Sequence, residues 1–181
     1  MWIILLVVLA IIIFAVIGMY NNLVTLRMRV KNAWAQIDTQ LKRRFDLIPN
    51  LVETVKGYAA HEEGTLEKVI AARNAYASAT TVDEKAEANN QLNNTLKSIF
   101  ALSESYPDLK ANQNFMALQT ELTGTEDKIA YSRQFYNDTV QMYNTAIMKF
   151  PAILFAGMFV FKDESFFKID ESEKEAVKVQ F

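Results

Sequence analysis

One histidine is the first residue with catalytic potential in this chain. His61-Glu62-Glu63 matches the start of the His-Glu-x-x-His motif, in which two histidines on one helix face bind zinc, but Thr65 occupies the place of the second histidine. The sequence contains no glycine-rich phosphate loop and no nucleophile elbow. We therefore interpret His61 as a solvated turn residue and predict that the protein is not an enzyme.

Three glutamates are the remaining candidates for metal chemistry. Glu104, Glu121 and Glu126 could form a carboxylate cluster of the kind that binds metals inside helix bundles. Such clusters also use Glu-x-x-His pairs, which are absent here. We predict no metal site and no cofactor.

Arg44 is the most informative charged residue, because it occupies an apolar position of a seven-residue repeat. It could contact an anion or a partner, or it could form a buried ion pair. We favour the ion pair, since a buried charge without a partner is costly whereas a paired one can fix helix register. If the two long helices predicted below pack antiparallel, with Tyr58 opposite about Asn112 and Tyr20 opposite Phe150, then Glu126 is level with Arg44 and Asp38 is level with Arg133.

The repeat containing Arg44 extends from Tyr20 to Tyr58. Its two columns are Leu23, Val30, Ile37, Arg44, Leu51 and Tyr58, and Tyr20, Arg27, Trp34, Leu41, Ile48 and Val55. This spacing predicts one long coiled-coil-like helix with an apolar seam. Pro49 lies inside it, so we expect a bend before Pro49 and not an end.

A second long helix is predicted from Phe115 to Phe150, with apolar residues again repeating every seven positions. Two shorter helices precede it, one after Gly64 and one after the capping box that begins at Thr81. We expect Asn89, Asn90, Asn93 and Asn94 of the helix after the capping box to face water. The fold class is all-α: an N-terminal transmembrane helix continues into an antiparallel up-down four-helix bundle with two long and two short helices.

Helix lengths predict a bare stalk near the membrane. Each long helix would span ~57 Å, whereas the two short ones would cover only ~20 to 35 Å of it. Apolar side chains on the uncovered part would then be available for self-association, because large exposed apolar surfaces usually mark interfaces. These side chains are Trp34, Ile37, Phe135, Tyr136, Val140 and Tyr143.

The stretch from Trp2 to Tyr20 contains no charged side chain. Nineteen helical residues span ~28 Å, close to the ~30 Å of a bilayer core, so we predict a transmembrane helix with Trp2 and Tyr20 at its two interfaces. A cleaved signal peptide would need a basic start and a shorter apolar core. Basic residues follow the segment from Arg27 onward, and the positive-inside rule predicts a cytoplasmic body.

The residues after the second long helix are apolar again, from Pro151 to Phe161. They are too few to span a bilayer. Either they contact the membrane interface through Phe155, Phe159 and Phe161, or they fold over the open end of the bundle. The predicted domains are residues 1–20, the transmembrane helix; 21–150, the bundle; and 151–181, this segment with a charged tail.

Composition excludes several classes of protein. A formal charge of −2 provides no basic surplus for binding nucleic acid. The absence of cysteine excludes disulfides, thiolate metal sites and thiol nucleophiles. Membrane lipid and further copies of the chain are the expected partners, which makes a self-associating membrane scaffold or membrane-organising protein the leading hypothesis. The alternative is an adaptor or sensor that recruits another protein, such as a membrane protease.

The run from Trp34 to Tyr58 resembles the signature of the bacterial LemA family, above all in Gln40-Leu41-Lys42-Arg43-Arg44, Asp46-Leu47-Ile48-Pro49-Asn50 and Val55-Lys56-Gly57-Tyr58. The resemblance continues in Ser105-Tyr106-Pro107, Tyr136-Asn137, Tyr143-Asn144 and Phe150-Pro151. It implies a single-pass protein of the bacterial inner membrane with a small helical bundle, in a family that includes a magnetosome-associated branch. It implies no enzyme activity.

Overall fold

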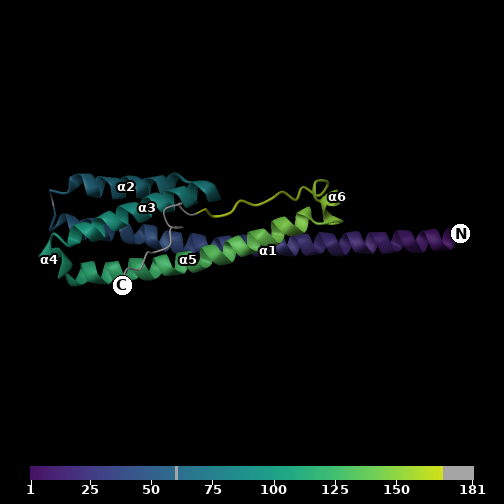
Figure 1. The fold of residues 1–181 in the computed structure, drawn as a ribbon, viewed down its shortest axis with the longest axis horizontal. Helices are drawn as coiled ribbons and strands as arrows, with labels where there is room; N and C mark the ends of the chain where they lie inside the picture. Colours follow the sequence, from purple (N-terminus) through teal and green to yellow (C-terminus); the bar gives the residue numbers. More distant parts are fainter. Residues whose placement is uncertain (60, 169–181) are drawn as a thin grey trace, which may run out of the picture. The chain divides into compact units, whose positions relative to one another are not determined.

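The computed structural model describes residues 1–59 and 61–168, and all regular secondary structure within them is α-helical. The elements are α1 (Trp2–Lys56), α2 (Glu63–Ser78), α3 (Val82–Ser103), α4 (Pro107–Lys110), α5 (Gln113–Met148) and α6 (Ala152–Ala156) (Figure 1). The predicted all-α class is therefore confirmed. The charged tail predicted at the C-terminus lies outside the described residues.

Helix α1 continues through Pro49 without ending. Proline lacks the backbone N–H that would bond to the carbonyl four residues earlier, so its position inside a helix has to be compensated by packing. The seam provides that packing, because Ile48 and Leu51 on either side of Pro49 are fully buried. The prediction that the helix would not stop at Pro49 was correct.

The capping box at the start of α3 is formed as the sequence predicted. The side chain of Thr81 accepts a hydrogen bond from the backbone N–H of Glu84, and the Glu84 carboxylate accepts from the backbone N–H of Thr81. The carboxylate also accepts from the N–H and hydroxyl of Thr80. These bonds satisfy amides that have no partner within the helix, and they hold the pKa of Glu84 at about 2.

The described chain forms two compact units, and both long helices contribute to each. Unit 1 contains residues 1–36 and 134–165, and unit 2 contains residues 37–59, 61–133 and 166–168 of the described chain. Helices α2, α3 and α4 belong wholly to unit 2. The domain boundaries predicted after residues 20 and 150 remain predictions, because the division between these units falls inside the long helices.

Unit 2 is a helical bundle with one apolar core. Its core residues come from α1, α2, α3, α4 and α5: Ile48, Leu51, Val52, Val55, Leu66, Val69, Ala72, Leu92, Leu96, Ile99, Leu109, Phe115 and Leu122. Helices α1 and α5 pack in the predicted register, since Asn112 Nδ2 donates to Tyr58 Oη at 2.9 Å.

Unit 1 pairs the first part of α1 with the last part of α5. The rings of Trp34 and Tyr136 lie 5.6 Å apart, as the predicted register requires. After α5 the chain turns through α6 and then runs back along α5 as an extended segment, which is yellow in Figure 1.

Candidate functional site

The candidate metal-binding carboxylates are used in ion pairs. Glu104 pairs with Lys110, Glu121 with Arg43, and Glu126 with Arg44. Among residues 1–59 and 61–168, no group of three or more histidine, aspartate or glutamate side chains could hold a metal ion. His61 is exposed in the turn before α2.

A buried polar cluster surrounds Arg44 in unit 2. The guanidinium of Arg44, whose side chain is only 4% exposed, donates to Glu126 Oε2 at 2.6 Å and to Asn89 Oδ1 at 3.0 Å. Asn93 Nδ2 donates to the other oxygen of Glu126 at 3.2 Å. The structure thus brings together the two residues that the seam register placed level with each other.

The expectation that Asn89 and Asn93 face water was wrong, because they are 1% and 5% exposed. A guanidinium carries five N–H donors and no acceptor, so burying one in a bundle requires several acceptors nearby. Asn89 supplies one of them directly, and Asn93 helps to hold the carboxylate that supplies another. Because Glu126 pairs with the guanidinium, the geometry favours the ion-pair interpretation of Arg44 over an anion site.

Asp38 takes a different partner from the one predicted. It forms an ion pair with Lys85 of α3 and accepts a hydrogen bond from the Tyr76 hydroxyl of α2 at 3.4 Å. Burial, together with the neighbouring Asp38 carboxylate, raises the pKa of Tyr76. The predicted pairing of Asp38 with Arg133 was wrong because the seam register considered only α1 and α5, whereas Asp38 faces the other two helices of the bundle.

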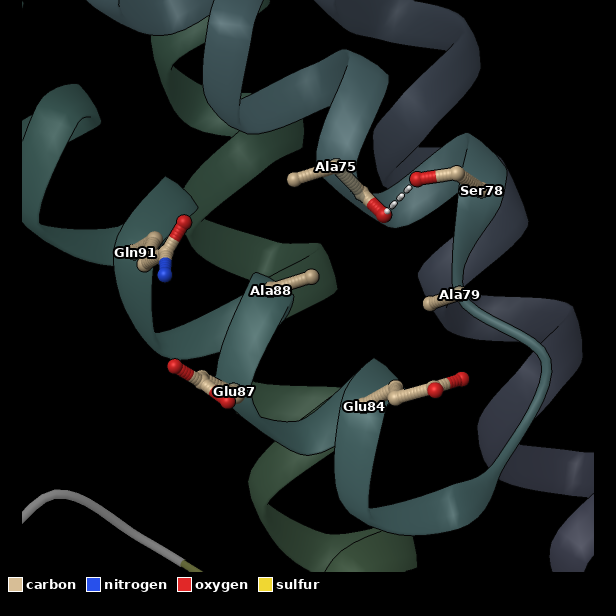
Figure 2. Close-up of a pocket in the computed structure, with 7 residues that line it drawn as sticks. All are labelled: Ala75, Ser78, Ala79, Glu84, Glu87, Ala88 and Gln91. Carbon is tan, nitrogen blue, oxygen red and sulfur yellow. Dashed lines mark hydrogen bonds between the residues drawn. The ribbon is translucent and has the colours of Figure 1, made fainter.

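Unit 2 has several cavities at its surface, and the described residues that line two of them do not form a catalytic arrangement. One of about 210 Å³ is lined by members of the Arg44 cluster, among them Arg44 and Glu126, and by apolar residues that include Leu96, Phe100 and Leu122. The other, of about 330 Å³, lies between the end of α2 and the start of α3 (Figure 2). Its Glu84 carboxylate turns toward the helix cap, where its hydrogen bonds are made.

The side chains predicted for self-association are mostly buried. Ile37, Tyr136, Val140 and Tyr143 are at most 1% exposed, Trp34 is half-buried, and Phe135 is 47% exposed. The expectation of a bare stalk was therefore wrong for four of the six.

The extended segment from Lys162 to Ser165 accounts for much of this burial in unit 1. Tyr136 Oη donates to the carbonyl of Ser165 at 2.8 Å, and Tyr143 Oη donates to the carbonyl of Lys162 at 2.9 Å. The side-chain amide of Asn144 both donates to and accepts from the backbone of Glu164, at 2.9 Å in each case. These side chains provide the hydrogen bonds that a neighbouring β-strand would otherwise give to the extended backbone.

The residues predicted to contact membrane fall into two groups. Trp2 is 83% exposed and Tyr20 is 40% exposed. Phe155 and Phe159 are half-buried, and Phe161 is only 7% exposed, so Phe161 cannot serve as a membrane contact. Instead, the rings of Phe159 and Phe161 pack edge-on against Tyr20, at 5.1 and 5.6 Å.

Helix α1 is, by length and composition, the one helix in the described part of the chain that could cross a membrane. None of the residues in its apolar N-terminal window is buried within the protein. Single helices of this kind also occur as signal sequences, but here the helix continues without interruption into the folded body. This arrangement indicates membrane anchoring.

Comparison with known proteins gives consistent matches over most of the chain. The LemA family model matches residues 33–181. Protein LemA of Metamycoplasma hominis is 27% identical over 139 residues, which cover 76% of this chain and 63% of that protein. Magnetosome protein MamQ of Magnetospirillum gryphiswaldense is 24% identical, over 82% of this chain and 64% of that protein. The chain thus matches just under two thirds of the length of these relatives.

Proposed function

Because the chain belongs to the LemA family, we propose that it is a non-enzymatic protein, anchored by one membrane-spanning helix, that associates with copies of itself as a membrane scaffold or membrane-organising protein. The observation that carries this proposal is the continuity of α1. Its first part is apolar and unburied, and its second part supplies core residues of the bundle.

The absence of a catalytic role is supported by how the polar side chains are used. In the described residues, the three candidate glutamates have cationic partners, and the buried Arg44 has Glu126 and Asn89. Catalytic groups need an acid, base or nucleophile held open toward a substrate. A bundle whose charges are matched in this way is suited to stability and not to chemistry.

The proposed location is the bacterial inner membrane, with the body on the cytoplasmic side. Arg27, Arg29 and Lys31 follow the apolar part of α1 within three turns. Basic residues next to a span are retained on the cytoplasmic side. Attaching a membrane-impermeant thiol reagent to a cysteine placed at exposed Lys56 in intact cells tests this: labelling before lysis would contradict a cytoplasmic body.

Self-association is proposed through the apolar side chains that unit 1 leaves exposed. On α5, Phe135 and Met142 are 47% and 55% exposed and lie seven residues apart. On α1, Val24 and Met28 are 37% and 49% exposed and lie four residues apart. Such spacings place each pair on one helix face, which is how a helix presents itself to another helix.

The test is gentle detergent extraction followed by mass measurement. We expect masses at multiples of the 20.6 kDa chain, and a shift toward the monomer in the variant Phe135→Gln. The matched control is Tyr131→Gln, which alters an aromatic residue of the same helix that is 75% exposed in unit 2. A clean monomer for the unaltered protein would contradict the scaffold.

The adaptor alternative would use the surface of unit 2, where Ile70 of α2 is 42% exposed. Crosslinking in membranes from the exposed Lys68 distinguishes the two functions. Products that contain two copies of the chain favour the scaffold, and products that contain a different protein favour the adaptor.

A further inference from the structure

The segment after α5 exposes large apolar side chains. These are Phe150, Met158, Val160, Leu154 and Ile153, with exposed fractions of 79%, 73%, 65%, 62% and 56%. A single exposed apolar side chain is ordinary, but several within eleven successive residues form a surface that water does not favour. Some other material is therefore expected to cover it.

Helix α6 turns its larger apolar side chains outward, which is the reverse of the arrangement in a helix on a water-facing surface. Its small residues Ala152 and Ala156 are buried, at 6% and 7% exposed, whereas its larger residues Ile153 and Leu154 point outward. In water, burying the larger side chains would be favoured, because burial free energy grows with apolar area. The orientation is instead suited to an apolar or interfacial environment on the outside.

The backbone of Val160 supports the same conclusion. Its φ is 58°, in the left-handed region, where a β-branched residue is strained and glycine is not. The strained valine gains little burial within the chain, since it is 65% exposed. Strained residues cluster at functional and ligand-contact sites, so the strain at Val160 fits a contact of this side chain outside the chain.

The packing against Tyr20 fixes where this segment lies. Tyr20 ends the apolar part of α1, and Phe159 and Phe161 pack against its ring at 5.1 and 5.6 Å. Tyrosine at the end of a membrane span lies at the level of the lipid headgroups. The segment is thereby held at the boundary of the same membrane.

The positively charged residues at the two ends of the segment are also suited to contact lipid. Lys149 precedes it and Lys162 follows it, and both are exposed. Lysine at such a boundary can keep its stem in the apolar layer while its ammonium group reaches lipid phosphates.

We propose that residues 150–160 insert into the interfacial layer of the leaflet reached by Tyr20, and that anionic phospholipid of this leaflet is their partner. This rests on the proposed function, because it takes the first part of α1 as the membrane span. It adds a second point of attachment for unit 1, beside the membrane-spanning part of α1.

The chain contains no cysteine, so a single introduced cysteine gives a label at one site. Leu154→Cys would be labelled with an environment-sensitive fluorophore in the full chain, reconstituted into phosphatidylcholine and phosphatidylglycerol vesicles. Quenching by lipid-attached nitroxide, carried at a shallow position for the label at residue 154 and at a deep position for the label at residue 9, is then compared with quenching by aqueous iodide. Leu9→Cys reports the membrane span, and Met116→Cys, at an exposed apolar position of unit 2, is the matched control.

We expect the labels at 154 and 9 to be quenched several-fold more by lipid nitroxide than by iodide, and the label at 116 to show the reverse. If the label at residue 9 is quenched from the lipid and the label at residue 154 is quenched from the water, this inference is wrong and membrane anchoring stands. If 9 also reports water, the anchoring itself is wrong. Protection of 154 from both quenchers would mean that protein covers the segment, which also overturns the inference.

The lysines provide the test of lipid charge. In the double variant Lys149→Gln/Lys162→Gln, quenching at 154 should no longer increase as the phosphatidylglycerol content rises. If the unaltered chain shows no dependence on phosphatidylglycerol, the assignment of anionic lipid as the partner is wrong.

Discussion

Replacing Glu126 by alanine tests the buried ion pair that joins the two long helices. The Arg44 side chain is only 4% exposed in the unaltered protein. Removing the Glu126 carboxylate leaves its guanidinium largely buried, with Asn89 still accepting one hydrogen bond. Asn93 loses Glu126 as an acceptor at the same time. The substitution therefore leaves a buried cation with fewer acceptors, which is more costly than the loss of one contact.

The magnitude follows from the exposure of the two side chains. Breaking a fully buried pair by removing one partner costs ~3–5 kcal/mol. Glu126 is 33% exposed, so water can reach part of the space it leaves, and the cost should be lower. We expect a loss of about 2–3 kcal/mol in the free energy of unfolding, where 2 kcal/mol corresponds to a change of ~30-fold in the unfolding equilibrium.

Glu121→Ala is the matched control. Glu121 lies on the same helix and pairs with Arg43, the neighbour of Arg44, but both side chains are more than 40% exposed. An exposed pair contributes ~0–1 kcal/mol. Comparing the two variants separates the effect of burial from that of losing a glutamate on α5.

The measurement is urea unfolding of the full chain in mild detergent, followed by circular dichroism at the helical band. The double variant Arg44→Met/Glu126→Leu should recover much of the lost stability, because it removes both charges. If Glu126→Ala costs no more than Glu121→Ala, the Arg44 cluster does not stabilise the helix register and this reasoning is refuted.

Three further predictions follow from other parts of the structure. Pro49→Ala should raise the free energy of unfolding by about 1–3 kcal/mol, because Pro49 is exposed and the substitution restores a backbone donor inside α1. The lowered pKa of Glu84 stabilises the folded state above the unfolded pKa of ~4.3, and this stabilisation is lost as pH falls toward 2. Acid titration of unfolding should therefore show a smaller stability loss between these pH values in Glu84→Gln than in the unaltered chain. Asn144→Ala should speed hydrogen exchange at the Glu164 amide, which donates to Asn144, whereas Thr145→Ala at the exposed neighbouring position should not.

The helices and their register could be predicted because helical periodicity repeats over many residues. A seven-residue pattern across both long helices leaves one register that buries both seams, and it places Arg44 level with Glu126 and Trp34 level with Tyr136. The same pattern failed for Asp38. Its partner Lys85 lies on a short helix whose rotation the pattern does not determine.

The covering of unit 1 by an extended segment could not be predicted in the same way. Its backbone is bound by hydroxyl and amide groups of Tyr136, Tyr143 and Asn144, so the side chains of the segment itself carry no periodic signal. The two tyrosines occupy seam positions, and the seven-residue pattern counts them as apolar, although a buried tyrosine hydroxyl needs a partner. Such hydroxyls at seven-residue spacing are therefore a sign that a polar backbone lies across the seam. Apart from the apolar first part of α1, unit 1 therefore exposes less apolar surface than the helix lengths suggested. Much of that remaining surface lies on residues 150–160, next to the ring of Tyr20.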